Sequence, residues 1–403
     1  MTVSLAAVAA ETRQRVQSFE LPLSAKNAWA VVFDRNLSSL AVENESGLVA
    51  VYSVNQSLGV PCVEFPGTAE DFTPEPFFIN KRSKIVFVSN GRQLLVARGT
   101  NLTAFDPATG RIVRHLESSD HPIDGLQISR DGSRVAALVG QSLPMALAFW
   151  DAESGRINPG FPTSRFPGAP KSGSWLSTGS LPLPGMCRAM SHDGRFFAVG
   201  GERRRIDLWD LDRKTLVSST KSTVSAGYVT ALAIGASNQI AAVINSFELH
   251  RLDSQLKTDT VLFTPSTITT ERSRFVISAI AVSGDGQRIA IAGMRVGSRP
   301  GFFGGAGEVV WDVPIAGEVQ LWDTLSGKRR ATFSGRADEK FLEVALDVSG
   351  SKIAAVAAGV HYRPAMTGAM QQSEELRPNK PVRISVWEFA ELVDAFGSKS
   401  ASE

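Results

Sequence analysis

Few side chains in this sequence could hold a metal or act as nucleophiles, since it has five histidines and two cysteines. Zinc sites in proteins usually take Cys or His ligands from C-x-x-C pairs, or from two histidines four residues apart on a helix. Cys62 and Cys187 lie far apart, and no two histidines have that spacing. We therefore expect no metal, no cofactor and no disulfide framework, with both thiols buried and inert.

Three other features could support catalysis, and each has a simpler interpretation. The glycine-rich segment 301–308 (GFFGGAGE) lacks the Gly-Lys-Ser/Thr of a phosphate-binding loop, so we interpret it as a flexible loop. The acid pair Glu374-Glu375 has no neighbour in sequence that would tune it for glycoside hydrolysis. His361 lies in a functional setting, but we favour a structural role for it. With no nucleophile-elbow motif present, we expect a protein that is not an enzyme.

The composition is that of a globular protein with balanced charge. The chain has 403 residues, of which 43% are hydrophobic, and 42 basic side chains face 40 acidic ones. A nucleic-acid partner is not expected, because proteins that bind phosphate backbones carry a basic excess. No apolar run reaches the ~18 residues of a membrane span. Residues 1–12 lack the positive start of a signal peptide, so we expect an N-terminal arm and a cytoplasmic location.

The strongest pattern in the chain is a repeat of two signals. A Ser-x-Asp-Gly turn lies between two short apolar runs, and an alternating strand that ends in an aromatic residue follows. The clearest copies are ISRDGSRVAALVG with LAFWDAESGR, MSHDGRFFAVGG with IDLWDLDRKT, and VSGDGQRIAIAG with VQLWDTLSGK. Glycine supplies the positive φ that such a turn requires. Each unit is predicted to be a small antiparallel sheet, which must stack on its neighbours to bury its faces.

The number of units can be counted from the aromatic residue that ends each alternating strand. We call these residues the anchors, and there are seven, with His250 replacing the ring in the fifth: Tyr52, Phe105, Trp150, Trp209, His250, Trp322 and Trp387.

Three Trp-Asp dipeptides, at 150/151, 209/210 and 322/323, each follow a Ser-x-Asp-Gly turn, and in this the chain resembles the WD-repeat (WD40-type) β-propellers. The resemblance covers nearly the whole chain and implies an all-β fold, a seven-bladed β-propeller of four-stranded antiparallel blades. The sequence departs from the family in lacking its Gly-His dipeptide; at the corresponding place in blade three it reads Ser118-Ser119. We expect the buried hydrogen-bond network of that histidine to be absent, which leaves more of the stability to apolar packing between sheets.

The last blade needs a strand from elsewhere, because little chain follows Trp387. The strand-like segment 13–22 (RQRVQSFELP) has no partner of its own, so the N-terminal strand is predicted to close the last blade as its outer strand. We expect one propeller over 13–390 and a C-terminal tail, 391–403, with a short capping helix formed by FAELVDAF.

Long connections should gather at one end of the blades. A blade needs roughly 40–45 residues, and the excess lies in three insertions, 159–184, 294–316 and 359–380. The first is a crossover between blades and the others join second strands to third strands. In a four-stranded antiparallel blade these connections emerge at the same end, which we call the insertion face. The opposite end, with the tight turns, is the turn face.

Loops on one side of a rigid scaffold are common places for binding. The insertions contain aromatic residues and arginines, which are enriched in protein interfaces, and the basic run 203–205 is predicted on the same face. We therefore expect a non-enzymatic scaffold, a monomeric ring within a complex, that binds other proteins. The alternative is a lactonase-like or hydrolytic enzyme or a small-ligand binder at the axial channel of that face. The candidate binding residues are Phe161, Phe166, Trp175, Arg203, Arg204, Arg205, Arg295, Arg299, Phe302, Phe303, Trp311, Tyr362 and Arg363.

Overall fold

The structure is a computed structural model of the chain. It describes residues 14–24, 28–44, 47–54, 61–65, 84–88, 91–139, 146–161, 187–201, 204–220, 227–236, 238–263, 273–303, 307–364, 372–376 and 381–389. Within these ranges all regular elements are β-strands, and no helix is long and apolar enough to cross a membrane. The expected helix after residue 389 lies outside the described residues.

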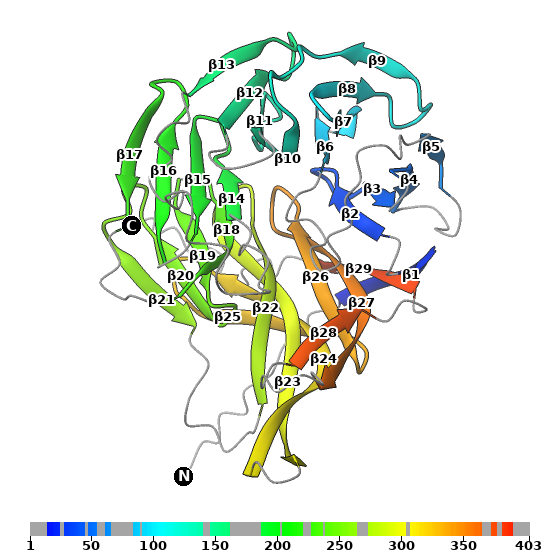
Figure 1. The fold of residues 1–403 in the computed structure, drawn as a ribbon, viewed down its shortest axis with the longest axis vertical. Helices are drawn as coiled ribbons and strands as arrows, with labels where there is room; N and C mark the ends of the chain where they lie inside the picture. The colour runs from blue at the N-terminus through cyan, green and yellow to red at the C-terminus, as the bar shows by residue number, and fades with distance from the viewer. Residues whose placement is uncertain are drawn as a thin grey trace, which may run out of the picture.

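Seven sheets are arranged in a ring (Figure 1). Blade one consists of β2 (Ala28–Phe33), β3 (Ser39–Asn44), β4 (Val49–Ser53) and β5 (Val63–Phe65). Blade two consists of β6 (Ile85–Val88), β7 (Gln93–Arg98), β8 (Asn101–Phe105) and β9 (Ile112–His115). Blade three consists of β10 (Ile123–Ile128), β11 (Arg134–Val139), β12 (Ala146–Asp151) and β13 (Ile157–Phe161).

The remaining blades follow the same order. Blade four consists of β14 (Cys187–Met190), β15 (Phe196–Gly200), β16 (Ile206–Asp210) and β17 (Thr215–Ser219). Blade five consists of β18 (Val229–Ile234), β19 (Ile240–Ile244), β20 (Glu248–Leu252) and β21 (Asp259–Phe263). Blade six consists of β22 (Ser273–Val282), β23 (Arg288–Phe303), β24 (Gly307–Asp323) and β25 (Arg329–Ser334). Blade seven consists of β26 (Glu339–Leu346), β27 (Lys352–Pro364), β29 (Pro381–Phe389) and β1 (Gln14–Ser24), and β28 (Gln372–Leu376) pairs with the far part of β27.

The prediction of a seven-bladed propeller with four antiparallel strands in each blade is therefore confirmed. The N-terminal strand closes the last blade as expected. It pairs antiparallel with β29, with Gln14 opposite Phe389 and Glu20 opposite Arg383. Leu21 of this strand is 1% exposed and belongs to the core cluster that joins blades seven and one.

The anchors lie in the third strand of each blade and pack against the blade that precedes it. Trp150 shares a core cluster with Leu102 and Ala104 of blade two, and Trp322 shares one with Leu249 of blade five. Tyr52 packs with blade seven in the same way. The wide rings thus fill the space between neighbouring sheets, where apolar burial is the main stabilising contribution.

The fourth strands of blades two to six each contain an irregularity. In blade four, Trp209 pairs with Leu216 but Leu208 pairs with Ser218, so Val217 is an extra residue. The register shifts at the same place, directly before the anchor, in blades two, five and six, and in blade three it shifts earlier, between Leu147 and Phe149. A bulge of this kind bends the strand and interrupts its hydrogen-bonding edge. The rim of the ring is thus a poor template for an added strand.

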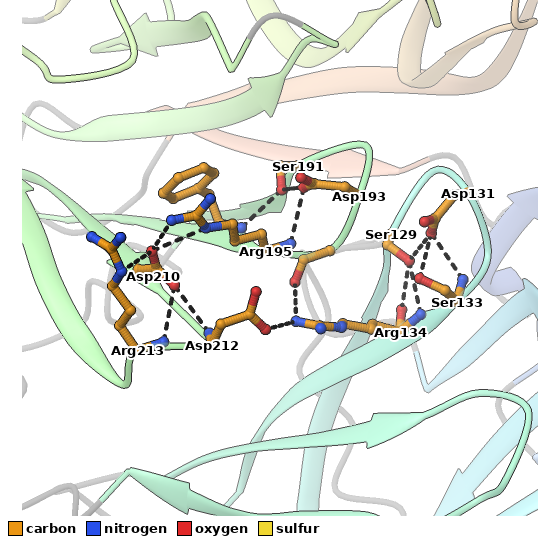
Figure 2. Close-up of polar contacts among 12 residues, drawn as sticks. Ser129, Asp131, Ser133, Arg134, Ser191, Asp193, Arg195, Asp210, Asp212 and Arg213 are labelled. Carbon is orange, nitrogen blue, oxygen red and sulfur yellow. Dashed lines mark hydrogen bonds and ion pairs between the residues drawn. The ribbon is translucent and has the colours of Figure 1, made fainter.

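The Ser-x-Asp-Gly turns share one hydrogen-bond pattern. In the blade-three turn, the Ser129 hydroxyl donates to Asp131 Oδ1 over 2.7 Å and accepts a 2.8 Å bond from the backbone N–H of Arg134. The turns at Ser191 and Ser283 repeat both contacts, and Figure 2 shows those at Ser129 and Ser191. The turn glycines have positive φ, as the sequence predicted, with Gly132 at 76°.

The insertion in blade six is a hairpin. Segment 301–308, interpreted above as a flexible loop, contributes residues 301–303 to β23 and 307–308 to β24, with Phe303 paired with Gly307. The loop interpretation is wrong for these residues, because they extend two long strands rich in valine and aromatic residues, which favour extended backbone. In Figure 1 the hairpin projects away from the ring.

Candidate functional site

The two ends of the ring differ in construction. At the turn face, arginines of one blade bind backbone carbonyls of the next. Arg134 of blade three donates to the Gly194 carbonyl over 3.5 Å and forms a 2.6 Å ion pair with Asp212, both in blade four (Figure 2). Arg288 of blade six donates to the Gly350 carbonyl of blade seven over 2.7 Å. These contacts join neighbouring turns into one tight surface.

One arginine of the turn face crosses the ring. Arg130 follows Ser129 in the blade-three turn, and its guanidinium donates to the carbonyls of Val282 in blade six and of Asp347 in blade seven, the latter over 2.8 Å. The equivalent turn position in blade six is Gly284, where an added Cβ would lie 2.5 Å from the Val348 carbonyl oxygen. A side chain at Gly284 would therefore clash with the backbone of blade seven.

The environment of Arg130 is unfavourable for its charge. Burial, reinforced by the nearby charge of Arg35, lowers its pKa to about 10. It remains a cation at neutral pH, because this value lies well above 7. The guanidinium therefore links blade three to blades six and seven at the turn-face end of the ring axis.

At the insertion face, polar clusters lie beside the anchors between neighbouring blades. In blade six, Arg295 binds both carboxylate oxygens of Glu318, at 2.9 and 3.1 Å. Gln320 donates to Glu318 and accepts a 3.1 Å hydrogen bond from the indole N–H of Trp322. Glu318 and Gln320 are buried, at 5% and 1% exposure. The cluster thus links a partly buried ion pair to the anchor.

Blade seven contains a similar cluster. Arg383 forms a buried ion pair with Glu339, and its Nη1 also donates to the hydroxyls of Ser385 and Ser18, at 2.8 and 3.1 Å. Because Ser18 belongs to β1, this cluster also ties the N-terminal strand into the blade. Breaking such a pair on one side leaves a buried charge and is strongly destabilising.

The junction between blades four and five contains the third cluster. Arg204 Nη1 lies 3.3 Å from Glu248 Oε2, and Glu248 is also 3.2 Å from His250 Nε2. The neighbouring Arg205 binds Asp207 at 2.9 Å, and Asp207 accepts a further bond from Ser219.

These clusters add to one expectation. We expected the absence of the Gly-His dipeptide to leave more of the stability to apolar packing, and the blades also contain hydrogen-bonded polar groups of other types beside their anchors. In blade three the Trp150 indole N–H donates to the Glu117 carbonyl over 2.8 Å, next to the Ser118-Ser119 that stands in place of Gly-His. The sequence signal was a polar residue two positions before the anchor, as at Asp207, Gln320 and Ser385.

Glu43 is the most perturbed carboxyl group among the described residues. It lies in β3 near the insertion face and is 7% exposed. Burial raises its pKa to about 7, against the lowering effect of Lys84 and Arg98 of blade two. A carboxyl group that exchanges its proton near neutral pH can act as an acid or a base.

Comparisons with known proteins bear on the fold. The chain is similar to the crystal structure of the Cps50 (Swd1) β-propeller domain of Myceliophteria thermophila, with a TM-score of 0.55 and 14% sequence identity over 93% of this chain and 100% of that domain. The chain has the fold of a WD40-type β-propeller. No family model matches the sequence, and no curated protein matches it. At this identity the likeness establishes the fold alone.

The structure of this WD40-type propeller places the candidate binding residues in three groups. Arg204, Arg205 and Arg295 are each in an ion pair with an acidic residue, as described above. The backbones of a second group lie in strands: Phe161 in β13, Arg299, Phe302, Phe303 and Trp311 in the β23–β24 hairpin, and Tyr362 and Arg363 in β27. Phe166, Trp175 and Arg203 lie outside the described residues. The register places Arg299 opposite Trp311 and Tyr362 opposite Glu374, so the blade-six and blade-seven sets each lie on one hairpin.

The cysteines and His192 lie in different environments. The expectation of two buried thiols is wrong, since Cys62, just before β5 of blade one, is exposed and Cys187 is partly exposed. His192 lies in a turn-face turn, as predicted, where its backbone carbonyl accepts a hydrogen bond from Asp131. Within the described ranges, no group of three or more His, Cys, Asp or Glu side chains is arranged to hold a metal ion.

Proposed function

We propose that the protein is a non-enzymatic scaffold that binds another protein through its insertion face. The observation that carries this proposal is the β23–β24 hairpin. Beyond the pair formed by Ser273 and Gly297, the strands β23 and β24 pair only with each other among the described residues, up to Phe303 and Gly307. A two-stranded hairpin is at best marginally stable in water on its own. Contact with a partner would stabilise it.

The sequence of the hairpin supports this proposal. Its outer arms contain Phe302, Phe303, Val309, Val310 and Trp311, and Ile315 at the base is 43% exposed. Aromatic side chains dominate the energetics of protein interfaces. The far part of β27 is similar, because in the part of the chain that the structure describes its residues 361–364 pair only with β28. The likeness to a WD40-type propeller domain supports an interaction scaffold in general terms.

A hairpin deletion tests the proposal. Gly297 and Val313 are direct partners in the ladder, so residues 298–312 can be replaced by Asn-Gly, which forms a tight turn between paired strands. We expect the ring to retain its unfolding transition while its bound partner is lost in quantitative affinity purification. The control is Leu325→Ser, which alters the most exposed apolar side chain on the turn face, at 76% exposure. Equal recovery of the same partners from the deletion and the control would refute the proposal.

A photo-crosslinking residue maps the face directly. Placed at Ile315, it should attach to the partner, whereas the same residue at Leu325 should not. Crosslinks from Leu325 alone would place the partner on the turn face and contradict the proposal.

A small-ligand binder or an enzyme is the second candidate, and Glu43 favours it. Such a ligand would enter from the insertion face, because Arg130 spans the turn-face end. A thermal-shift screen of small polar metabolites tests this candidate. A shift that appears with the wild type and disappears with Glu43→Gln would support it, and equal shifts would count against a role for Glu43.

A further inference from the structure

The fifth anchor is a histidine, in a position where the other six blades have Tyr, Phe or Trp. His250 lies in β20, and its side chain is buried, with 6% of the residue exposed. It pairs with Ala242 of β19 and Val261 of β21. Unlike the rings of Phe, Tyr and Trp, an imidazole has two ring nitrogens, and when it is buried both require hydrogen-bond partners.

Both ring nitrogens of His250 face carboxylates. Nδ1 lies 2.8 and 3.1 Å from the two carboxylate oxygens of Asp259, and Nε2 lies 3.2 Å from Glu248 Oε2. A neutral imidazole has one N–H donor, so one of these contacts would set a ring lone pair against a carboxylate. Only the doubly protonated ring donates to both.

The groups around His250 come from four strands and one turn. Glu248 lies on its own strand and Asp259 on β21, while β19 contributes the apolar Ala242. From blade four, the apolar Ile206 and Leu208 of β16 belong to the same core cluster as Ala242 and Leu252. The one cation described in the network is Arg204, in the turn before β16, which pairs with Glu248. Two carboxylates thus balance two cations, the guanidinium and the imidazolium.

Arg204 connects this network to the backbone of the insertion face. Its own φ is 56°, and its N–H donates to the Gly227 carbonyl, at the start of blade five, over 3.2 Å. An added Cβ on Gly227 would lie 2.9 Å from Arg204 Nε. The ion pair with Glu248 therefore holds a strained turn of blade four against blade five.

We propose that His250 is a protonation switch, whose doubly protonated form locks blades four and five together at the insertion face and whose neutral form releases Glu248 and loosens that junction. The switch is independent of any partner, because all of its groups belong to this chain. It would make one sector of the ring respond to changes in pH above about 6.5, the ordinary pKa of histidine.

The direction of the pKa shift agrees with this switch. Burial by itself lowers the pKa of His250, but the hydrogen bonds and charges of Asp259 and Glu248 outweigh it and raise the pKa above 6.5. Because the folded pKa exceeds the unfolded one, the stabilising contribution is complete below about 6.5 and disappears as the pH rises through the folded pKa.

An NMR titration of the full chain tests the protonation state. The His250 ring should titrate with a midpoint above 6.5, the ordinary value for histidine. Each unit of pKa elevation corresponds to about a tenfold preference of the folded state for the protonated ring. A midpoint at or below 6.5 would overturn the proposal.

Hydrogen exchange measured across the pH range tests the junction. After correction for intrinsic exchange, amides of β16, β20 and the 204–205 turn should lose protection as the pH rises through the His250 midpoint. His250→Gln should abolish this dependence, His115→Gln should leave it intact, and Asp259→Asn, a milder change at a half-exposed position, should shift it to lower pH. Persistence of the dependence in folded His250→Gln, or in Asp259→Asn without a shift, would contradict the switch.

Discussion

The guanidinium of Arg130 in blade three donates a 2.8 Å hydrogen bond to the backbone carbonyl of Asp347 in blade seven, 217 residues later in the chain. This contact connects opposite sides of the ring without involving the blades between them. Arg130→Ala leaves buried carbonyls on the far side without their donor, which costs about 1–3 kcal/mol. Urea unfolding should show this loss, and Arg111→Ala, an exposed arginine on the same face, should show almost none. Equal effects of the two changes would exclude a bracing role for Arg130.

Glu43 provides a prediction about pH. Its folded pKa of about 7 lies above the ordinary 4.5, so ionisation of Glu43 makes the folded protein progressively less stable as the pH rises from 4.5 to 7. Glu43→Gln should therefore be more stable than the wild type at pH 8, by about 2–3 kcal/mol, with a difference that vanishes toward pH 4.5. Denaturant unfolding at several pH values measures it. Glu64→Gln, exposed on β5 of the same blade, is the control, and a pH-independent difference would rule out the raised pKa.

Closure by the N-terminal strand can be tested at Leu21. A carboxylate buried at this position, as in Leu21→Asp, should cost about 3 kcal/mol or more and release β1 from β29. The exposed edge should then promote association between molecules. Denaturation and light scattering check both effects. Glu20→Gln, which removes an exposed ion pair with Arg336, should cost less than about 1 kcal/mol; a similar loss in both variants would argue against closure through Leu21.

At Gly293, near the base of the long hairpin, β23 lies very close to the backbone of β22. A Cβ at this position would lie 1.9 Å from the Val276 carbonyl oxygen, whereas a Cβ at Gly201 would meet nothing within 4 Å. Gly293→Ala should therefore destabilise the protein by about 2–3 kcal/mol, since the backbone of β22 must move, and hydrogen exchange should increase first in β22 and β23. Gly201→Ala should be tolerated. A stable Gly293→Ala protein with unchanged exchange would show that the two strands can separate at no cost.

The sequence predicted the blades because their signals are local. The alternation before Trp150, Trp209 and Trp322, with the turns that precede them, lies within about twenty residues, and strand formation follows from such short patterns. The closing strand was predictable by a count, since six blades were complete and the seventh lacked one strand.

The contacts of the candidate site were harder to predict because they are non-local. Nothing near Arg130 in sequence indicates acceptors in blades six and seven, and nothing near Arg204 indicates Glu248. Arg204, Arg205 and Arg295 were read from the sequence as partner-binding residues, but whether an arginine is paired depends on residues that only the packed ring brings together. The prediction of a flexible loop at 301–308 was wrong for a similar reason, because the strands that flank its glycines become long only when they pair.

The pairing of β1 with β29 has a consequence for biosynthesis. Residues 14–24 are synthesised long before residues 381–389, so the ring cannot close until the later segment has been made. Until then blade seven lacks this strand pairing, and its open sheet edges could be bound by other molecules. The ring can therefore close only after translation has reached residue 389. A chain that terminates earlier keeps an open edge, by which quality control could recognise it.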